Sequence, residues 1–245
     1  MFKDIKQVMK DSVLYGIGNV AVKLVGFILI PLYTDAEYFS TADYGLMGLL
    51  EVTSQILIAV MGLSLYSGLI RWYWDAEYRD KQKTIFFTTL LFTILTSLCI
   101  GSVLWLNVGE LSALLVQQEG YSLGGELPYI LQLLILTSML GAVVEVPQNL
   151  LRLQRKPIYY SLTNIVRLFV TLVLTIYFTI SLHRGVSGVY EAQLVGIVIQ
   201  LLMVLPLVIK NSSCRVDRRC TIQLLAYSYP LVFPAIVGSL LTVFD

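Results

Sequence analysis

Long apolar runs separated by short charged links limit this chain to very few folds. Each run holds ~20 residues or more, the length of an α-helix that crosses a bilayer. Hydrophobic residues make up 57% of the chain and charged residues only 13%, whereas a soluble domain averages about 25% charged. The sequence therefore predicts an all-α, polytopic transmembrane helix bundle. We expect six complete spans, at about residues 12–33, 44–69, 84–107, 128–151, 158–181 and 188–209, and the start of a seventh near 222.

The basic residues gather in every second link. Residues 1–10, 71–83, 152–157 and 210–221 hold 14 of the 17 lysines and arginines. The intervening links contain a single base, Arg184. Because Lys and Arg accumulate on the cytoplasmic side of membrane proteins, we expect a multi-pass protein of the cell inner membrane. Its N-terminus and the three basic links would be cytoplasmic.

Four segments can be assigned along the chain. Residues 1–10 place apolar and basic side chains at helical spacing, which favours an amphipathic cytoplasmic helix on the membrane surface over a frayed tail. Residues 11–210 form the predicted six-helix bundle, and 211–221 form a basic cytoplasmic linker. Residues 222–245 would be the start of a second bundle. Since half a span cannot satisfy its backbone in lipid, we expect an N-terminal fragment of a longer protein, or a degraded or truncated chain.

Polar side chains inside the predicted spans are the strongest functional signal. A charge near the bilayer centre costs roughly 3 kcal/mol on insertion scales, so such a group is expected to face other helices or a wet cavity. Lys23 lies near the middle of the first span, and Asn19 lies one helical turn before it. Arg167 lies in the fifth span, with Asn164 on the same helical face. These four residues are candidates for binding a substrate in a cavity.

Two carboxylates also lie inside predicted spans, Glu51 in the second and Glu145 in the fourth. At ~1.5 Å per residue, Glu51 lies at a depth similar to that of Lys23, and Glu145 lies about 5 Å from the depth of Arg167. Either pair could therefore form an ion pair that joins two helices. Alternatively, all four groups line a central cavity, in which the cations hold an anionic headgroup and Glu51 or Glu145 couples a proton or cation.

Motifs of other functional classes are missing from the sequence. It contains no nucleophile–base–acid set, no P-loop, no Gly-rich dinucleotide turn and no metal-ligand spacing. The three cysteines are accompanied by no His or Cys cluster. A net charge of +1 indicates no nucleic-acid partner. We therefore expect no catalytic residue, metal or cofactor, and a protein that is not an enzyme. The glycine-rich link 108–127 is expected to be flexible.

Several stretches resemble, in order along the chain, the polysaccharide biosynthesis proteins. These are lipid-linked oligosaccharide flippases, and their superfamily also includes the multidrug and toxin extrusion carriers. The similarity is one of hydrophobic pattern and short motifs, and it extends over nearly the whole chain. The matching stretches are YGIGNVAVKLVGFILIPLYT with STADYGLMGLLE, GLSLYSGLIRWYWD, PQNLLRLQRKPIYYSLTNIVRLFVTLVL and LLAYSYPLVFPAIVGSLLTVFD.

This resemblance implies two six-helix bundles around a cavity that opens alternately to either side, of which this chain would be the first bundle and the start of the second. The implied cargo is a polyprenyl-diphosphate-linked oligosaccharide, a unit of O-antigen, capsule or exopolysaccharide, carried from the inner to the outer leaflet. Relatives commonly carry a basic residue at the position of Lys23, which implies contact with the headgroup. Arg167 would also hold the diphosphate in this scheme.

The implied partners are membrane lipids, a polysaccharide polymerase and glycosyltransferases. Two alternatives remain open on the sequence. One is a multidrug or cation antiporter of the same superfamily, which would have a more acidic cavity. The other is a membrane-embedded transferase, or a non-catalytic component of polysaccharide assembly.

Overall fold

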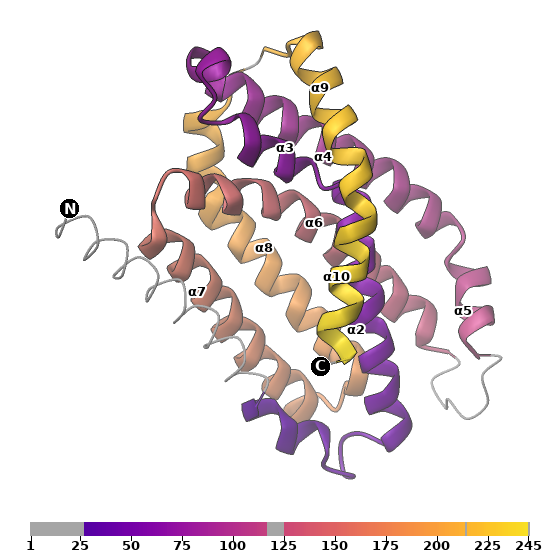
Figure 1. Cartoon of the computed structure of the whole chain (residues 1–245). Coiled ribbons are helices and arrows are strands. Elements are labelled where there is room, and N and C mark those ends of the chain that lie inside the picture. The colour runs from indigo at the N-terminus through magenta and orange to yellow at the C-terminus, as the bar shows by residue number, and fades with distance from the viewer. Residues whose placement is uncertain (1–26, 117–124, 214, 245) are drawn as a thin grey trace.

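The computed structural model describes residues 27–116, 125–213 and 215–244 (Figure 1). The predicted amphipathic helix at 1–10 and most of the first span, including Asn19 and Lys23, lie outside the described residues. Throughout the described ranges the chain is helical, with turns and short links and no strand. Residues 27–33, at the end of the predicted first span, are helical as well.

The helices follow one another with short connections. Their bounds are α2 (Thr41–Gly62), α3 (Leu65–Trp72), η1 (Ala76–Lys81), α4 (Gln82–Leu106), α5 (Val108–Val116), α6 (Leu127–Leu153), α7 (Pro157–Ile176), η2 (Tyr177–Ser181), α8 (Gly185–Asn211), α9 (Arg218–Ser228), η3 (Tyr229–Leu231) and α10 (Val232–Phe244).

Six of the described helical segments are long and apolar enough to cross a membrane. They match the predicted spans two to six and the predicted seventh run. The all-α membrane bundle is therefore confirmed, and these helices indicate a multi-pass membrane protein. Their bounds are Thr41–Gly62, Tyr78–Leu106, Leu127–Leu153, Pro157–Ser181, Gly185–Asn211 and Arg218–Gly238.

The second span is interrupted, whereas its apolar run predicts one continuous helix over 44–69. Ser40 begins α2 with a reciprocal capping box, in which its hydroxyl and the Asp43 carboxylate bond each other's backbone N–H. The helix then stops at Leu63 and Ser64, which adopt left-handed backbone angles with φ of 46° and 49°. Since this conformation is unfavourable for residues with a side chain, the break must be stabilised by the surrounding packing. The chain resumes as α3 at Leu65.

The link 108–127 is predicted to be flexible, but its first part is helical. Residues Val108–Val116 form α5. Val108 is buried in the hydrophobic core, and Leu111 packs against the same cluster. Apolar contacts at helical spacing therefore order the first half of this link, in spite of its glycines.

The three basic links meet at one end of the bundle, which we call the basic end (residues 71–83, 152–157 and 210–221). Gln154 joins them, because its Nε2 donates to the Tyr73 hydroxyl at 3.1 Å and to Asn211 Oδ1 at 2.8 Å. Figure 1 shows this end at the top, where α3, α6 and α8 terminate. The alternation of bases along the sequence therefore predicts their common location correctly.

The buried hydrophobic core is divided into two clusters. One is built from α2, the first part of α6 and the start of α8, and the other from α3, the start of α4, the last part of α6 and α9. On α6, Ala142 belongs to the first cluster and Val146 to the second, so Glu145 lies at the boundary between them.

The seventh span packs along the interrupted second span. α10 contacts α2, and α9 contacts α3, an arrangement that can be followed in Figure 1. The seventh span tightens into one 3-10 turn at η3, which contains Pro230, and continues as α10. Gly68 of α3 permits the close approach of α9, because a Cβ at this position would lie 2.6 Å from Leu224 Cδ2. The break of the second span therefore lies at the level of the 3-10 turn of the seventh span.

Candidate functional site

Arg167 lines a cavity of about 290 Å³ between α2, α6, α7 and α8, which we call the Arg167 cavity. Its wall combines both signs of charge with hydroxyl and amide groups. The lining residues are Glu51, Ser54, Gln55, Ile58, Thr137, Gly141, Asn164, Arg167, Leu168, Thr171 and Gln193.

Neutral side chains hold the Arg167 guanidinium in place. Its Nη1 donates to Gln200 Oε1 at 3.2 Å, and Gln200 Nε2 donates to Asn164 Oδ1 at 3.0 Å. Asn164 Nδ2 in turn donates to the carbonyl of Tyr160 at 2.8 Å. Gln200 is only 1% exposed, so this chain of hydrogen bonds lies in the interior between α7 and α8. It satisfies polar groups whose burial without partners would be costly.

A glycine brings α8 close to α7 at the level of this network. A Cβ on Gly196 would lie 2.2 Å from Thr171 Oγ1 and 3.3 Å from the carbonyl oxygen of Arg167. Real Cβ atoms do not approach other atoms this closely, so the absent side chain lets the two helices pack at this distance. The packing positions Thr171 and Arg167 on the wall of the cavity.

Glu51 supplies the opposite charge on the α2 wall of the Arg167 cavity. Its carboxylate is exposed and accepts a hydrogen bond from Gln55 Nε2 at 3.3 Å. Among the described residues, no ion pair joins Arg167 to Glu51 or to Glu145. The cation and the carboxylate therefore share one cavity without neutralising each other by direct contact.

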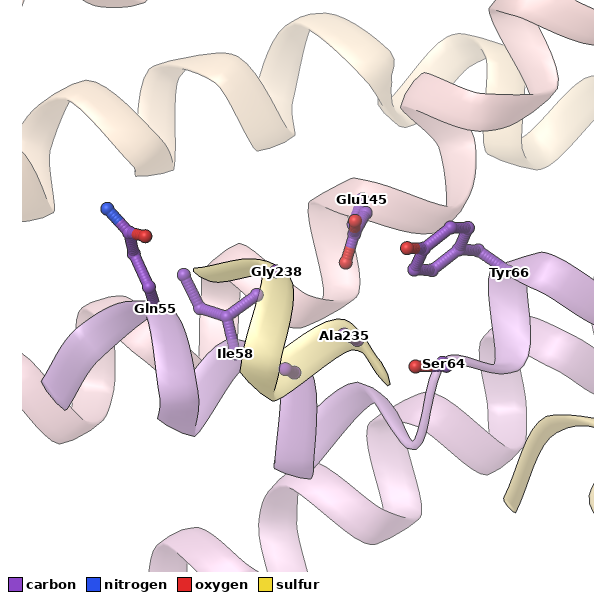
Figure 2. A pocket seen from close by; sticks show the side chains of 8 residues that line it. Gln55, Ile58, Ser64, Tyr66, Glu145, Ala235 and Gly238 are labelled. Carbon is purple, nitrogen blue, oxygen red and sulfur yellow. The ribbon is translucent and has the colours of Figure 1, made fainter. Parts of the chain in front are cut away.

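Glu145 lines a second cavity, of about 370 Å³, which we call the Glu145 cavity. Figure 2 shows the Glu145 carboxylate and the Tyr66 hydroxyl pointing toward one another. In the described part of the chain the carboxylate has no hydrogen-bond partner. The lining residues are Gln55, Ile58, Ala59, Ser64, Tyr66, Glu145, Ala235 and Gly238.

The break of the second span and the 3-10 turn of the seventh span lie beside the Glu145 cavity. Ser64, at the break of the second span, is 2% exposed, and its Oγ lies 3.4 Å from the carbonyl oxygen of Leu231 in η3. The seventh span also supplies Ala235 and Gly238 to the wall (Figure 2). Because Gln55 and Ile58 line both cavities, the Glu145 cavity adjoins the Arg167 cavity.

The structure brings three of the six candidate residues together, since Glu51, Asn164 and Arg167 line one cavity. Glu145 lies in the adjoining cavity, so the suggested bridge between Glu145 and Arg167 is not formed. Asn19 and Lys23 lie outside the described residues.

Several polar residues of the site were not singled out from the sequence. Gln200 holds Arg167, Gln55 lies between the two cavities, and Tyr66 faces Glu145. Amides inside apolar runs are a signal of the same kind as charges in spans, and scanning for them would have found both glutamines. Within the described ranges, no group of three or more His, Cys, Asp or Glu residues is placed to hold a metal ion.

Comparisons with known proteins identify the fold of the chain. No family model matches the sequence, and no curated protein sequence matches it. Among solved structures, an outward-facing multidrug resistance MATE family transporter of the MOP superfamily superposes with a TM-score of 0.72 at 18% identity, over 96% of this chain and 52% of that one.

Two further solved structures have named organisms. A MOP superfamily transporter from Pyrococcus furiosus, described as having a binding pocket of reverse polarity, gives a TM-score of 0.72 at 18% identity, over 96% of this chain and 52% of that one. A variant of a Vibrio cholerae MATE transporter gives a TM-score of 0.69 at 15% identity, over 96% of this chain and 53% of that one. The chain thus spans about half the length of these structures, and it has the fold of about half of a MATE transporter.

Proposed function

We propose that this chain is part of a membrane transporter that moves a polyprenyl-diphosphate-linked oligosaccharide from the inner to the outer leaflet of the cell inner membrane. The proposal combines the resemblance of the sequence to oligosaccharide flippases with a transporter fold and a polar cavity between membrane-length helices. In this proposal the N-terminus is cytoplasmic, and a polysaccharide polymerase and glycosyltransferases act on the same lipid-linked sugars.

The observation that carries this proposal is that Arg167 forms no direct ion pair with a described carboxylate. Arg167 lines the cavity, and its guanidinium donates to the neutral amide of Gln200, with no ion pair among the described residues. A guanidinium held in this way keeps donors available for a diphosphate, which it can bind through charge-assisted hydrogen bonds. Asn164, which also lines the cavity, completes the polar wall on α7.

The carboxylates supply the ion-coupling part of the proposal. Glu51 faces the same cavity as Arg167, so binding of a proton or cation at Glu51 would change the charge that an anionic cargo meets. Glu145 lies at the contact between the second and seventh spans, where a change of charge would act on the packing of α2 against α10. Lys23 and Asn19 are proposed to extend the binding surface from the first span.

Movement in this proposal is the rocking of two bundles around a central site. The seventh span would be the first helix of the second bundle. Its contacts with α2 and α3 would then be the place where the two bundles meet. An interrupted helix beside a binding cavity, such as the second span here, is a frequent feature of secondary transporters.

The test is flipping by the intact protein in vesicles. A fluorescent polyprenyl-diphosphate oligosaccharide is placed in the vesicles, and its leaflet is read by a quencher that reaches one side only. Arg167→Ala should lose most of the flipping, and Arg167→Lys should keep more of it, because the charge is retained. The same comparison applies to Lys23→Ala and Lys23→Arg.

Arg79→Ala serves as a control, since Arg79 is an exposed base of η1 that lines neither cavity. It should flip the lipid at the unaltered rate. Unchanged flipping by a well-folded Arg167→Ala protein would reject the proposed role of the cation.

A multidrug or cation antiporter is the second candidate, favoured by the two carboxylates, which each line a cavity, and by the likeness to a multidrug resistance MATE transporter. It predicts ion-driven efflux of a cationic dye that is lost in Glu51→Gln or Glu145→Gln and maintained in Arg167→Ala. The two candidates therefore respond in opposite ways to loss of the cation.

A further inference from the structure

A third pocket, of about 350 Å³, opens at the basic end and shares no lining residue with the two cavities described above. It is lined by Trp74, Leu153, Gln154 and Arg155. Leu153 is the last residue of α6 and of its membrane-length segment. The pocket therefore lies where this helix leaves the apolar layer, which is the depth of lipid headgroups.

Arg155 occupies a backbone position that normally belongs to glycine. The last turn of α6 closes as a Schellman motif, in which the N–H of Lys156 donates to the carbonyl of Leu151 and the N–H of Arg155 to that of Arg152, both at 3.0 Å. Arg155 has a φ of 52°, in the left-handed region. A side chain there carries an energetic cost that glycine avoids, and a charged side chain placed at such cost points to a use for it.

Arg155 is also the base of this turn that is not engaged by its neighbours. Arg152 donates to the Tyr160 hydroxyl, and its guanidinium lies 4.6 Å from the centre of the Tyr160 ring. Lys156 Nζ donates to Gln154 Oε1 at 2.8 Å. Within the described ranges the Arg155 guanidinium has no hydrogen bond or ion pair, so its donors remain available on the pocket wall.

Trp74 forms the aromatic wall of the same pocket. It is 65% exposed, and its ring packs edge-on against Tyr73 with the ring centres 5.2 Å apart. The Tyr73 hydroxyl accepts the hydrogen bond from Gln154 Nε2, so Trp74 is positioned relative to the turn that carries Arg155. Tryptophan side chains favour the membrane interface, and Leu153 adds an apolar surface beside the base.

We propose that this pocket binds the phosphate-bearing headgroup of an anionic phospholipid. The Arg155 guanidinium would donate charge-assisted hydrogen bonds to the phosphate, while Trp74 and Leu153 contact the glycerol and the first methylenes. The bound lipid would touch the turn after α3 and the end of α6, and so join two of the basic links. This site is separate from the proposed transport cavity, and its occupancy does not require transport.

The experiment titrates the intact protein in detergent with phosphatidylglycerol or phosphatidylcholine and measures bound lipid by native mass spectrometry. Arg155→Gly is the informative variant, since glycine favours the left-handed turn while the base is removed. It should bind phosphatidylglycerol about tenfold more weakly, the loss expected when one hydrogen bond between charged groups is removed. Binding of phosphatidylcholine should be unchanged, and Arg155→Lys should lie between the two proteins.

Arg79→Gln removes a different exposed base at the same end and should leave phosphatidylglycerol binding unaltered. An equal loss in this control would show that bulk charge, not the pocket, attracts the lipid. Inorganic phosphate at the same concentration as the lipid is the remaining arm. Displacement of the lipid under these conditions would identify a site for the free anion and overturn the lipid assignment, as would unchanged lipid binding by Arg155→Gly.

Discussion

Arg167 donates from Nη1 to Gln200 Oε1 at 3.2 Å, across the contact between α7 and α8. The partner of this half-buried cation is thus an amide, which orients the guanidinium and leaves its charge in place. A carboxylate at the same position would pair with the guanidinium and neutralise it. The amide partner therefore distinguishes Arg167 from a cation in a structural ion pair, because its charge remains available to a ligand.

Gln200→Ala should destabilise the protein by about 1–3 kcal/mol, because it leaves buried donors and acceptors of Arg167 and Asn164 without partners. Thermal unfolding of the purified protein in detergent measures the change. Gln193→Ala is the matched control, since Gln193 lies on the same helix and makes no hydrogen bond among the described residues. Equal losses in the two variants would show that the network contributes nothing specific.

Gln200→Glu should keep the protein folded, because the new carboxylate can still accept the hydrogen bond from Arg167. It should nevertheless reduce flipping of a diphosphate-linked sugar about tenfold or more, since the cation would now be paired before the cargo arrives. Flipping in vesicles and thermal unfolding are measured on the same preparation. A variant that is stable and flips at the normal rate would contradict a role for the free charge of Arg167.

The contact between Lys81 and Asp217 should depend on pH. Lys81 Nζ lies 2.7 Å from Asp217 Oδ2 at the basic end, and this hydrogen bond, together with the N–H of Arg219, holds the pKa of the Asp217 carboxyl below its usual range. A carboxyl with a lowered pKa in the folded state contributes stability above its unfolded value of about 3.9, and the contribution disappears as pH falls through the folded pKa. The start of α9 should therefore be protected at neutral pH and lose protection in acid.

Hydrogen-exchange protection factors of the amides at the start of α9 measure this effect, since they correct for the intrinsic pH dependence of exchange. Asp217→Asn keeps an oxygen that can cap α9 and removes the charge, so its protection should be lower at neutral pH and should no longer change in acid. High salt should act in the same direction on the unaltered protein, because both side chains are solvent-accessible. Identical pH profiles for the two proteins would refute the contact.

The arrangement of the spans follows from the sequence because length, hydropathy and link charge are properties of the chain itself. The meeting of Tyr73, Gln154 and Asn211 at the basic end is the geometric consequence of those alternating links. The rotation of each helix about its axis is different, since it is decided by packing. The depths estimated from the sequence allowed Arg167 to meet Glu145. In the structure, helix packing instead places Glu51 in the same cavity as Arg167, and Gln200 next to the Arg167 guanidinium.

The break at Leu63 and Ser64 could not be predicted either. The apolar pattern continues through it without a proline, and Gly62 is the single local hint of a helix end. The left-handed residues persist because α9 and α10 pack alongside, so a contact between segments far apart in the chain decides the local backbone.

Gly68→Val should separate α9 from α3 and open the basic end. A Cβ at Gly68 would lie 2.6 Å from Leu224 Cδ2 and 3.1 Å from Ser228 Oγ. Because Leu224 is 2% exposed, its side chain has little room to turn away from the additional methyl groups of valine. Cys220, a free thiol that is 3% exposed on α9, reports the separation. In a protein carrying Cys214→Ser, maleimide should label Cys220 several-fold faster in Gly68→Val. Gly45→Val places the same side chain where nothing lies within 4 Å of a Cβ and should leave Cys220 protected. If Cys220 reacts equally slowly in all three proteins, the close packing of α3 against α9 does not close the basic end.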